Sequence, residues 1–246
     1  MADKPTPKPR KPKVAKADLS APLPLKKRAL GWIGRGLAGV AGFFGLLIVL
    51  YSFVPVPTTL YMMGESVRLG GVERDWVGWD DITPAMARSV VAAEDANFCL
   101  HWGFDMAEIR KAVEAGSNRG ASTLSQQVVK NTFLWHGRSW LRKAMEAALT
   151  PVVELVWSKR RILEVYLNVA EFGEGVFGVE AAAQHHFGVP ARDLTDVQAA
   201  RLAAVLPDPK GRSASNPSDF VRRRTRSILS GAETIMADGR AACFEE

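Results

Sequence analysis

One uncharged apolar segment limits what this chain can fold into. Residues 37–56, LAGVAGFFGLLIVLYSFVPV, form a run of twenty positions without a charged side chain. An α-helix of about this length crosses a hydrocarbon core of about 30 Å. The sequence therefore predicts a transmembrane helix, which we place at residues 29–56.

The basic residues beside this segment predict its orientation. Residues 26–28 are Lys-Lys-Arg and Arg35 follows them, all on the N-terminal side of the apolar run. Basic residues favour the cytoplasmic side of a membrane, so we expect a cytoplasmic N-terminus and a body on the opposite side. A cleaved signal peptide is the alternative. The run is long for such a peptide, and Pro55 and Pro57 follow it where a cleavage site of small residues would be expected.

The charge of the chain is concentrated in its N-terminal tail. Residues 1–28 are rich in lysine and proline and have little to bury, so we expect a disordered cytoplasmic tail. Residues 1–35 hold ten lysines and arginines and two aspartates, and the whole chain has a net charge of +6. The remaining 211 residues therefore carry a net charge of −2. The high isoelectric point comes from the tail, and no nucleic-acid partner is expected.

The chain has two cysteines, Cys99 and Cys243, which are too few for a disulfide framework. A bridge between them is possible, and the sequence alone does not establish it. Cys99 and His101 resemble a fragment of a metal site. No second Cys/His pair follows at ligand spacing, so a structural zinc ion is not expected.

From about Asp81 onward the sequence is typical of helices. Thr83 and Pro84 form a start signal, with threonine as the N-cap and proline at the first helical position. On a helical period, Glu94 falls on the same face as several apolar residues, while Asp95 lies nearer the polar side. The apolar residues of that face are Met86, Ala87, Val90 and Ala93.

A carboxylate on an apolar face has two interpretations. Glu94 could be a buried residue that is satisfied by an arginine or a helix terminus, because an unpaired buried charge is costly. Alternatively, Glu94 could act as a general acid or base. An apolar setting disfavours the charged carboxylate and raises its pKa toward neutral, as a general acid or base needs. The residue alone leaves both open.

A second helix is predicted to open at Asp105, where Asp105 and Glu108 have capping-box spacing, and residues 116–120 are predicted to form a loop. The segment that follows is unusually rich in side chains that form hydrogen bonds. A surface helix face with Ser122 or Thr123 as N-cap would explain it. A face that binds a sugar or a phosphate would explain it equally, since a helix N-terminus and Lys130 suit an anion.

Basic residues then accumulate around a second glutamate. Arg138, Arg142 and Lys143 precede Glu146, and a surface salt bridge between Arg142 and Glu146 is the simplest interpretation. Pro151, farther along the same helical region, predicts a kink or a break. Two acids with several cations between them suggest acid–base chemistry on an anionic substrate.

Five blocks resemble, in order, those of the peptidoglycan glycosyltransferases, both the glycosyltransferase domain of class A penicillin-binding proteins and its stand-alone form. The resemblance covers roughly residues 60–230. It departs from the usual pattern at Leu124 and Ser125, where Ile-Thr is common, and at His186, where a tyrosine is common. The blocks are EDANFCLHWGFD at 94–105, GASTLSQQVVKN at 120–131, RKAME at 142–146, KRRILEVYLN at 159–168 and AAAQHHFG at 181–188.

The resemblance implies a mainly α, lysozyme-like glycosyltransferase domain, which we place at residues 57–240, behind one N-terminal transmembrane helix. It implies that Glu94 is the catalytic base, which takes a proton from the 4-hydroxyl of the N-acetylglucosamine of lipid II. That oxygen would attack the growing lipid-linked glycan, release undecaprenyl pyrophosphate and form a β-1,4 bond with inversion.

The resemblance also implies roles for the cations. Lys130 and Arg138 would bind the pyrophosphate, with support from Arg142 and Lys143. Glu146, the second candidate catalytic residue, would orient these cations or help to hold a divalent metal ion, Mg²⁺ or Mn²⁺. The candidates for hydrogen bonds to sugar and phosphate are Ser122, Thr123, Gln126, Gln127 and Asn131.

We therefore expect a single-pass enzyme of the inner membrane with a periplasmic catalytic domain. Its partners would be lipid II, the lipid-linked glycan, the bilayer and other cell-wall synthases. The sequence has no Ser-x-x-Lys motif, so transpeptidase activity is not expected. Two alternatives remain, namely a lysozyme-like enzyme that cleaves glycan and a membrane-anchored scaffold for cell-wall proteins.

Overall fold

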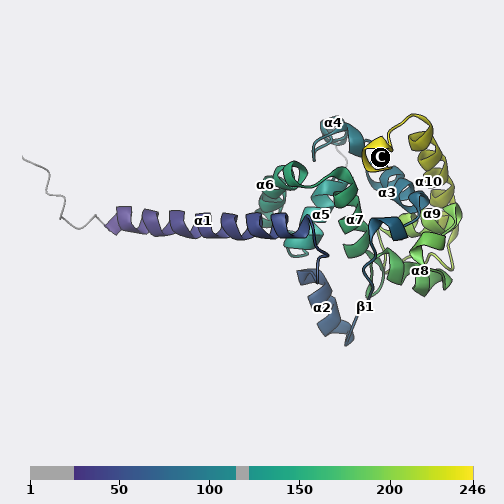
Figure 1. Ribbon diagram of the computed structural model, residues 1–246, viewed down its shortest axis with the longest axis horizontal. Coiled ribbons are helices and arrows are strands. Elements are labelled where there is room, and N and C mark those ends of the chain that lie inside the picture. Colours follow the sequence, from purple (N-terminus) through teal and green to yellow (C-terminus); the bar gives the residue numbers. More distant parts are fainter. Residues whose placement is uncertain (1–24, 115–121, 246) are drawn as a thin grey trace, which may run out of the picture. The chain divides into compact units, whose positions relative to one another are not determined.

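The computed structural model describes residues 25–114 and 122–245 (Figure 1). The chain divides into two units, residues 1–43 and residues 44–246. The predicted disordered tail lies almost entirely outside the described residues, and so does the predicted loop at 116–120.

The apolar segment forms α1, Leu25–Tyr51, which begins in the first unit and ends in the second. Its part at Gly31–Tyr51 has a mean hydropathy of 2.0 and is long and apolar enough to cross a bilayer. The helix ends five residues before the predicted boundary at 56. Pro55 and Pro57 explain this end, because the residue before a proline is disfavoured in a helix.

The second unit is mainly helical, as the sequence predicts. Its longer elements are the helices α2 Leu60–Leu69, α3 Pro84–Glu94, α4 Met106–Glu114, α5 Leu124–Phe133, α6 Trp140–Val156, α7 Lys159–Val169, α8 Val179–Phe187, α9 Asp196–Val205 and α10 Asp219–Ala237. Short helices complete it: α11 Ala242–Glu245 and the 3₁₀ turns η1 Trp79–Asp81, η2 Phe98–Leu100 and η3 Ala191–Asp193.

Two groups of helices form the core. In one, α3, α9 and α10 pack side by side; in the other, α5 packs against α6 and α7 (Figure 1). Small buried side chains on α9, at Ala199, Ala200, Ala203 and Ala204, allow the first group to pack closely. The two groups hold α3, which ends at Glu94, the first residue of the first sequence block, and α5, which carries most of the second block.

A small sheet of three strands lies beside α8. Its order is β1 Glu73–Arg74, β3 Val176–Phe177 and β2 Glu171–Gly173. β1 runs parallel to β3, while β2 and β3 form an antiparallel pair. The sheet connects the chain before α3 to the chain after α7.

The predicted starts of three helices are confirmed. α3 begins at Pro84 after Thr83, and Asp105 accepts hydrogen bonds from the first backbone N–H groups of α4, those of residues 107 and 108. Thr123 caps α5 and shares a reciprocal capping box with Gln126. These starts position the segments that carry Glu94 and Lys130.

The predicted interruption at Pro151 is not an end of the helix, because α6 continues through it to Val156. Proline removes the hydrogen bond to the carbonyl of Ala147. Ala147 is exposed, which leaves that carbonyl open to solvent, and Val153 and Trp157 beyond it are buried. The packing of this last turn offsets the unfavourable proline.

The possible bridge between Cys99 and Cys243 is formed, with 144 residues between the two cysteines. Cys99 is therefore not a zinc ligand. The bond joins η2 to α11, two short elements.

We expect this disulfide to stabilise the domain by about 2–5 kcal/mol, because it closes a very long loop in the unfolded chain. Chemical unfolding of the protein with and without a reducing dithiol measures the difference. A double variant, Cys99→Ser with Cys243→Ser, is the control and should not respond to the dithiol. An identical unfolding midpoint in oxidised and reduced protein would contradict the expectation.

Candidate active site

Glu94 is the last residue of α3, and its side chain is half-buried. Its Oε2 accepts a hydrogen bond of 3.0 Å from Nε2 of Gln127 on α5. Oε1 of Gln127 accepts a second bond, of 3.3 Å, from the hydroxyl of Tyr166 on α7. Burial, followed by the Glu94 charge, raises the pKa of Tyr166 well above its usual value, so the hydroxyl stays protonated and can donate. Three helices thus fix the orientation of one carboxylate.

The relative burial of Glu94 and Asp95 is the reverse of the prediction. Asp95 is only 8% exposed, whereas Glu94 reaches solvent. Asp95 accepts hydrogen bonds from the backbone N–H of Leu124 (3.0 Å) and from Nε2 of His101 (2.9 Å). The helix ends at Glu94, so a helical period extended to residue 95 no longer describes where the side chain lies. Asp95 joins the end of α3 to the start of α5.

Glu146 lies at the centre of a group of cations and is only 2% exposed. Its carboxylate accepts a hydrogen bond of 2.7 Å from Nη1 of Arg142 and another from Nζ of Lys143. Nζ of Lys143 also donates to Oγ of Ser122, at 3.3 Å. The predicted pair of Arg142 and Glu146 is therefore a buried arrangement that orients two cations, and not a surface salt bridge.

Lys130 faces this group from α5. Burial is the main cause that lowers the pKa of its ammonium group, and the charges of Glu146, Arg142, Glu94 and Lys143 also act on it. Among the described residues, no side chain or carbonyl forms a hydrogen bond or an ion pair with its Nζ. A half-buried cation without a partner is suited to bind an anionic ligand.

Two of the predicted sugar-binding residues have structural contacts. Oγ1 of Thr123 donates to the carbonyl of Gly103 (2.7 Å), and Oε1 of Gln126 accepts from the N–H of Thr123 (3.1 Å). Both side chains are buried. Gly103 itself has φ +85° and lies against Thr150, so no larger residue fits there. A role for Thr123 and Gln126 in substrate binding stays a prediction.

The hydrogen bond between Glu94 and Gln127 joins residues that line two cavities. One, of about 350 Å³, is lined by Glu94, Ser122 and Thr123. Another, of about 260 Å³, is lined by Gln127, Lys130 and Asn131. The sequence singled out all six residues, and the structure places them in these two cavities.

The remaining predicted cations line a third cavity, of about 270 Å³. Arg138 is exposed at its edge, and Arg142 and Lys143 form its wall. Because Lys143 also contacts Ser122, this cavity adjoins the one that contains Glu94.

Arg224 of α10, which was not predicted from the sequence, also lines the cavity of Glu94. Its Nη2 donates a hydrogen bond of 2.8 Å to the carbonyl of Ala93. The only signal in the sequence is its position beside the buried face of α10, next to Val221 and Thr225. That signal does not distinguish Arg224 from any other arginine at the margin of a buried face.

His136 was also missed, and it lies between Lys130 and Tyr61. Its Nε2 contacts Oδ1 of Asn131 at 3.1 Å, and its Nδ1 is buried without a hydrogen-bond partner among the described residues. Burial, reinforced by the charge of Lys130, lowers the pKa of His136 from 6.5 to about 4. The neutral ring therefore packs edge-on against Tyr61, at 3.7 Å between ring centroids.

This lowered pKa predicts a loss of stability in acid. Between pH 6.5 and about 4 the unfolded chain binds more protons at this residue than the folded chain, so the stability present above pH 6.5 falls as the pH falls. With allowance for partial solvent exposure we expect about 2 kcal/mol from His136. Urea unfolding between pH 7 and pH 4.5 measures it. His136→Gln can keep the bond to Asn131 and should show a smaller loss; an unchanged loss would contradict the assignment.

Both oxygens of Glu146 accept hydrogen bonds, from Arg142 and Lys143. Asp95, His101 and Asp105 lie close enough together to hold an ion. Their carboxylates accept hydrogen bonds, and Nδ1 of His101 has no partner among the described residues. A role for Glu146 as a metal ligand stays a prediction.

The helical domain places an oriented carboxylate beside fixed cations. This arrangement is typical of an enzyme that transfers a group from an anionic carrier. The model of the family described as Transglycosylase matches residues 63–233, and the chain belongs to this family. It is accordingly an enzyme that transfers glycosyl groups, and the predicted mainly α, lysozyme-like fold is confirmed.

Similar proteins share most of the chain. One from Jannaschia sp. (strain CCS1) is 67% identical over 213 residues, which cover 87% of this chain and 89% of that protein. Another from Cronobacter sakazakii is 50% identical and covers 83% of this chain and 90% of its own length. A third from Salmonella enteritidis is 51% identical over 221 residues. Each is named a biosynthetic peptidoglycan transglycosylase.

Proposed function

We propose that this chain polymerises the glycan strands of peptidoglycan. The transferred group is the growing lipid-linked glycan, and the acceptor is the 4-hydroxyl of the N-acetylglucosamine of lipid II. The names of the relatives support the substrate class. The observation that carries the proposal is the oriented carboxylate of Glu94 near the ammonium group of Lys130, which has no partner in the part of the chain that the structure describes.

In the proposed reaction Glu94 accepts the proton of the acceptor hydroxyl as its oxygen attacks C1 of the terminal N-acetylmuramic acid of the donor. The bond from C1 to the pyrophosphate oxygen breaks, and undecaprenyl pyrophosphate leaves with the bonding electrons. Attack on the face opposite the leaving group inverts the anomeric centre and gives a β-1,4 bond. A base whose orientation is fixed by Gln127 needs no rearrangement during proton transfer.

The departing pyrophosphate gains negative charge, which the cations are suited to stabilise. Lys130 has no partner among the described residues, and burial strengthens its attraction for an anion. Glu146 orients Arg142 and Lys143 toward the same region, and Arg138 lies exposed beside them. Glu146 thus acts through its neighbours as a positioning residue.

A divalent cation, Mg²⁺ or Mn²⁺, would be held mainly by the phosphate oxygens of the substrate, because both oxygens of Glu146 are engaged. We assign no step of the reaction to this ion.

The membrane anchor suits a substrate with a polyprenyl tail. α1 is long and apolar enough to hold the enzyme in the bilayer in which both substrates are anchored. Restriction to one surface raises the effective concentration of enzyme and substrate for each other. The disulfide supports a catalytic domain on the periplasmic side, since such bonds persist in oxidising compartments.

Several apolar side chains near the active site are exposed, which supports contact of this region with lipid. Leu100, Trp102, Met106 and Val113 all lie on or just before α4. The sequence contains no transpeptidase nucleophile of the Ser-x-x-Lys type, so the proposed activity is polymerisation without cross-linking.

Incubation of the full-length protein in detergent with fluorescent lipid II and Mg²⁺ tests the proposal. We expect a ladder of longer products on a gel and the release of one undecaprenyl pyrophosphate for each bond formed. Bound but unchanged lipid II would favour a scaffold, and shortening of preformed glycan would favour a hydrolase. Either result would contradict the proposed function.

A further inference from the structure

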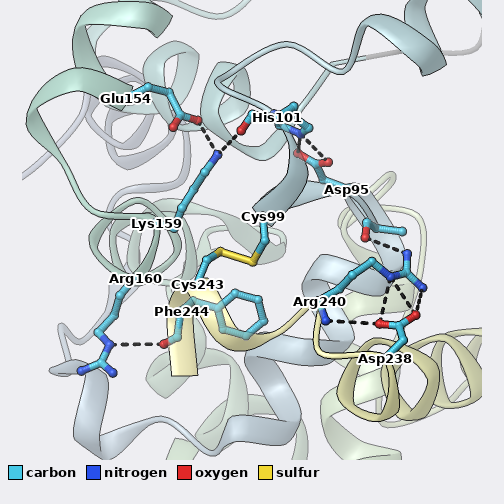
Figure 2. Close-up of a disulfide and its surroundings, with 11 residues drawn as sticks. Asp95, Cys99, His101, Glu154, Lys159, Arg160, Asp238, Arg240, Cys243 and Phe244 are labelled. Carbon is cyan, nitrogen blue, oxygen red and sulfur yellow. Dashed lines mark hydrogen bonds and ion pairs between the residues drawn. A yellow bond between two sulfur atoms is a disulfide. The ribbon is translucent and has the colours of Figure 1, made fainter. Parts of the chain in front are cut away.

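The last residues of the chain are attached to the segment that follows Glu94. Cys243 forms the disulfide with Cys99 (Figure 2). Nη1 of Arg240 donates a hydrogen bond of 3.0 Å to the carbonyl of Ala96. These two links reach positions two and five residues beyond Glu94. We call residues 238–245 the C-terminal segment.

Further contacts hold the C-terminal segment in place. Asp238 accepts hydrogen bonds from Nε of Arg240 at 3.0 and 2.9 Å (Figure 2). These bonds help to orient the guanidinium group that donates to Ala96. Phe244 is fully buried and packs against Phe98 of η2, with 6.5 Å between ring centroids. The carbonyl of Phe244 accepts a bond of 3.2 Å from Nε of Arg160 on α7. The segment is therefore a packed part of the domain.

The chain between Glu94 and the disulfide has little regular structure to hold it. α3 ends at Glu94, and the 3₁₀ turn η2 begins only at Phe98. Asp95 is bound to Leu124, which ties it to α5, and to His101. The stretch at 95–99 is thus held both by α5 and by the C-terminal segment.

Residues 238–245 lie beyond residues 63–233, which match the family model. Arg240 and Cys243 therefore lie outside the matched region, while Ala96 and Cys99, which they contact, lie within it. Family membership assigns them no role.

We propose that Arg240 and the Cys99–Cys243 disulfide are positioning elements for Glu94, and that the disulfide must be formed for full transferase activity. The inference rests on the proposed function. Both links fix the backbone just after the catalytic base, and a displacement of about 1 Å at a reacting group can reduce a rate by up to about 10²-fold.

Reduction tests the proposal on the unmodified chain. A reducing dithiol breaks the bond between the two sulfurs, each cysteine gains one hydrogen, and the dithiol is oxidised to its cyclic disulfide. We expect kcat for lipid II polymerisation to fall about tenfold, with KM changed by less than about twofold. The double variant Cys99→Ser with Cys243→Ser should show the same low kcat with and without the dithiol.

Arg240 gives a second test that leaves the disulfide intact. Arg240→Ala should lower kcat about threefold to tenfold, and Arg240→Lys should recover part of the loss because lysine can still donate to the carbonyl of Ala96. The matched control is Arg222→Ala, which removes an exposed arginine of α10 paired with Asp219 and should leave kcat unchanged. All rates are measured at a temperature at which circular dichroism shows folded protein.

Hydrogen exchange separates this proposal from the proposed function. Backbone amides of residues 95–100 should exchange faster in the reduced protein and in Arg240→Ala, while those of α5 should not change. If wild-type protein does not act on lipid II, the proposed function fails, and the exchange result still decides whether the links order this stretch. Unchanged kcat and unchanged exchange in reduced protein and in Arg240→Ala would overturn the inference.

Discussion

Glu94→Gln is expected to slow glycan polymerisation by about 10²–10⁴-fold, the range that loss of a general base produces. The substituted amide has the same shape, and its oxygen can still accept the hydrogen bond from Nε2 of Gln127. The local structure should therefore persist, while the ability to take a proton from the acceptor is lost. The rate of ladder formation from fluorescent lipid II measures the effect.

Two further measurements test whether the lost activity reflects the chemical step and not weaker binding or unfolding. The variant should bind lipid II as tightly as the wild type and unfold at the same temperature. Glu233→Gln is the matched control, because it makes the same change at an exposed carboxylate of α10, away from the cavity of Glu94. Polymerisation by Glu94→Gln at close to the wild-type rate would show that Glu94 is not the base.

Lys130→Ala is expected to lower the rate by about 10²–10³-fold, which is typical for removal of one group that stabilises developing charge. Burial lowers the pKa of Lys130, so the folded protein gains no stability from holding this cation in place. The variant should therefore lose activity without losing stability. Steady-state rates with lipid II and thermal unfolding measure the two effects.

The control for Lys130→Ala is Arg226→Ala, which removes an exposed cation from α10. Lys210 is unsuitable as a control, because its Nζ lies 2.9 Å from Glu65 and over the ring of Tyr61, and Tyr61 lines the cavity of Lys130. Equal and small losses in Lys130→Ala and Arg226→Ala would show that Lys130 does not stabilise the leaving group.

Features that depend on neighbouring residues could be predicted from the sequence. Thr83 with Pro84, Asp105, and Thr123 with Gln126 are local signals, and each marks a helix start that the structure contains. The apolar run likewise predicts α1, although its end depends on prolines just beyond it. Local chemistry fixes these features before any tertiary contact forms.

Features that depend on distant contacts could not be predicted. Asp95, and not Glu94, is the more buried of the two acids because Leu124 and His101 bind Asp95 where α3 ends. The pairing of Cys99 with Cys243 depends on α11 packing against η2 and α7. Arg224 enters the cavity of Glu94 only because α10 packs against α3. In each case the partner lies far away in the sequence, and the periodicity of one segment does not identify it.

The central claim is that this chain forms β-1,4 glycan with Glu94 as the base. The most direct test incubates wild type and Glu94→Gln in parallel with fluorescent lipid II and digests half of each product with lysozyme, which cleaves β-1,4 bonds. The account predicts a ladder from the wild type that lysozyme removes, and no ladder from the variant although it binds lipid II. A ladder that resists lysozyme, or a ladder of equal intensity from the variant, would contradict it.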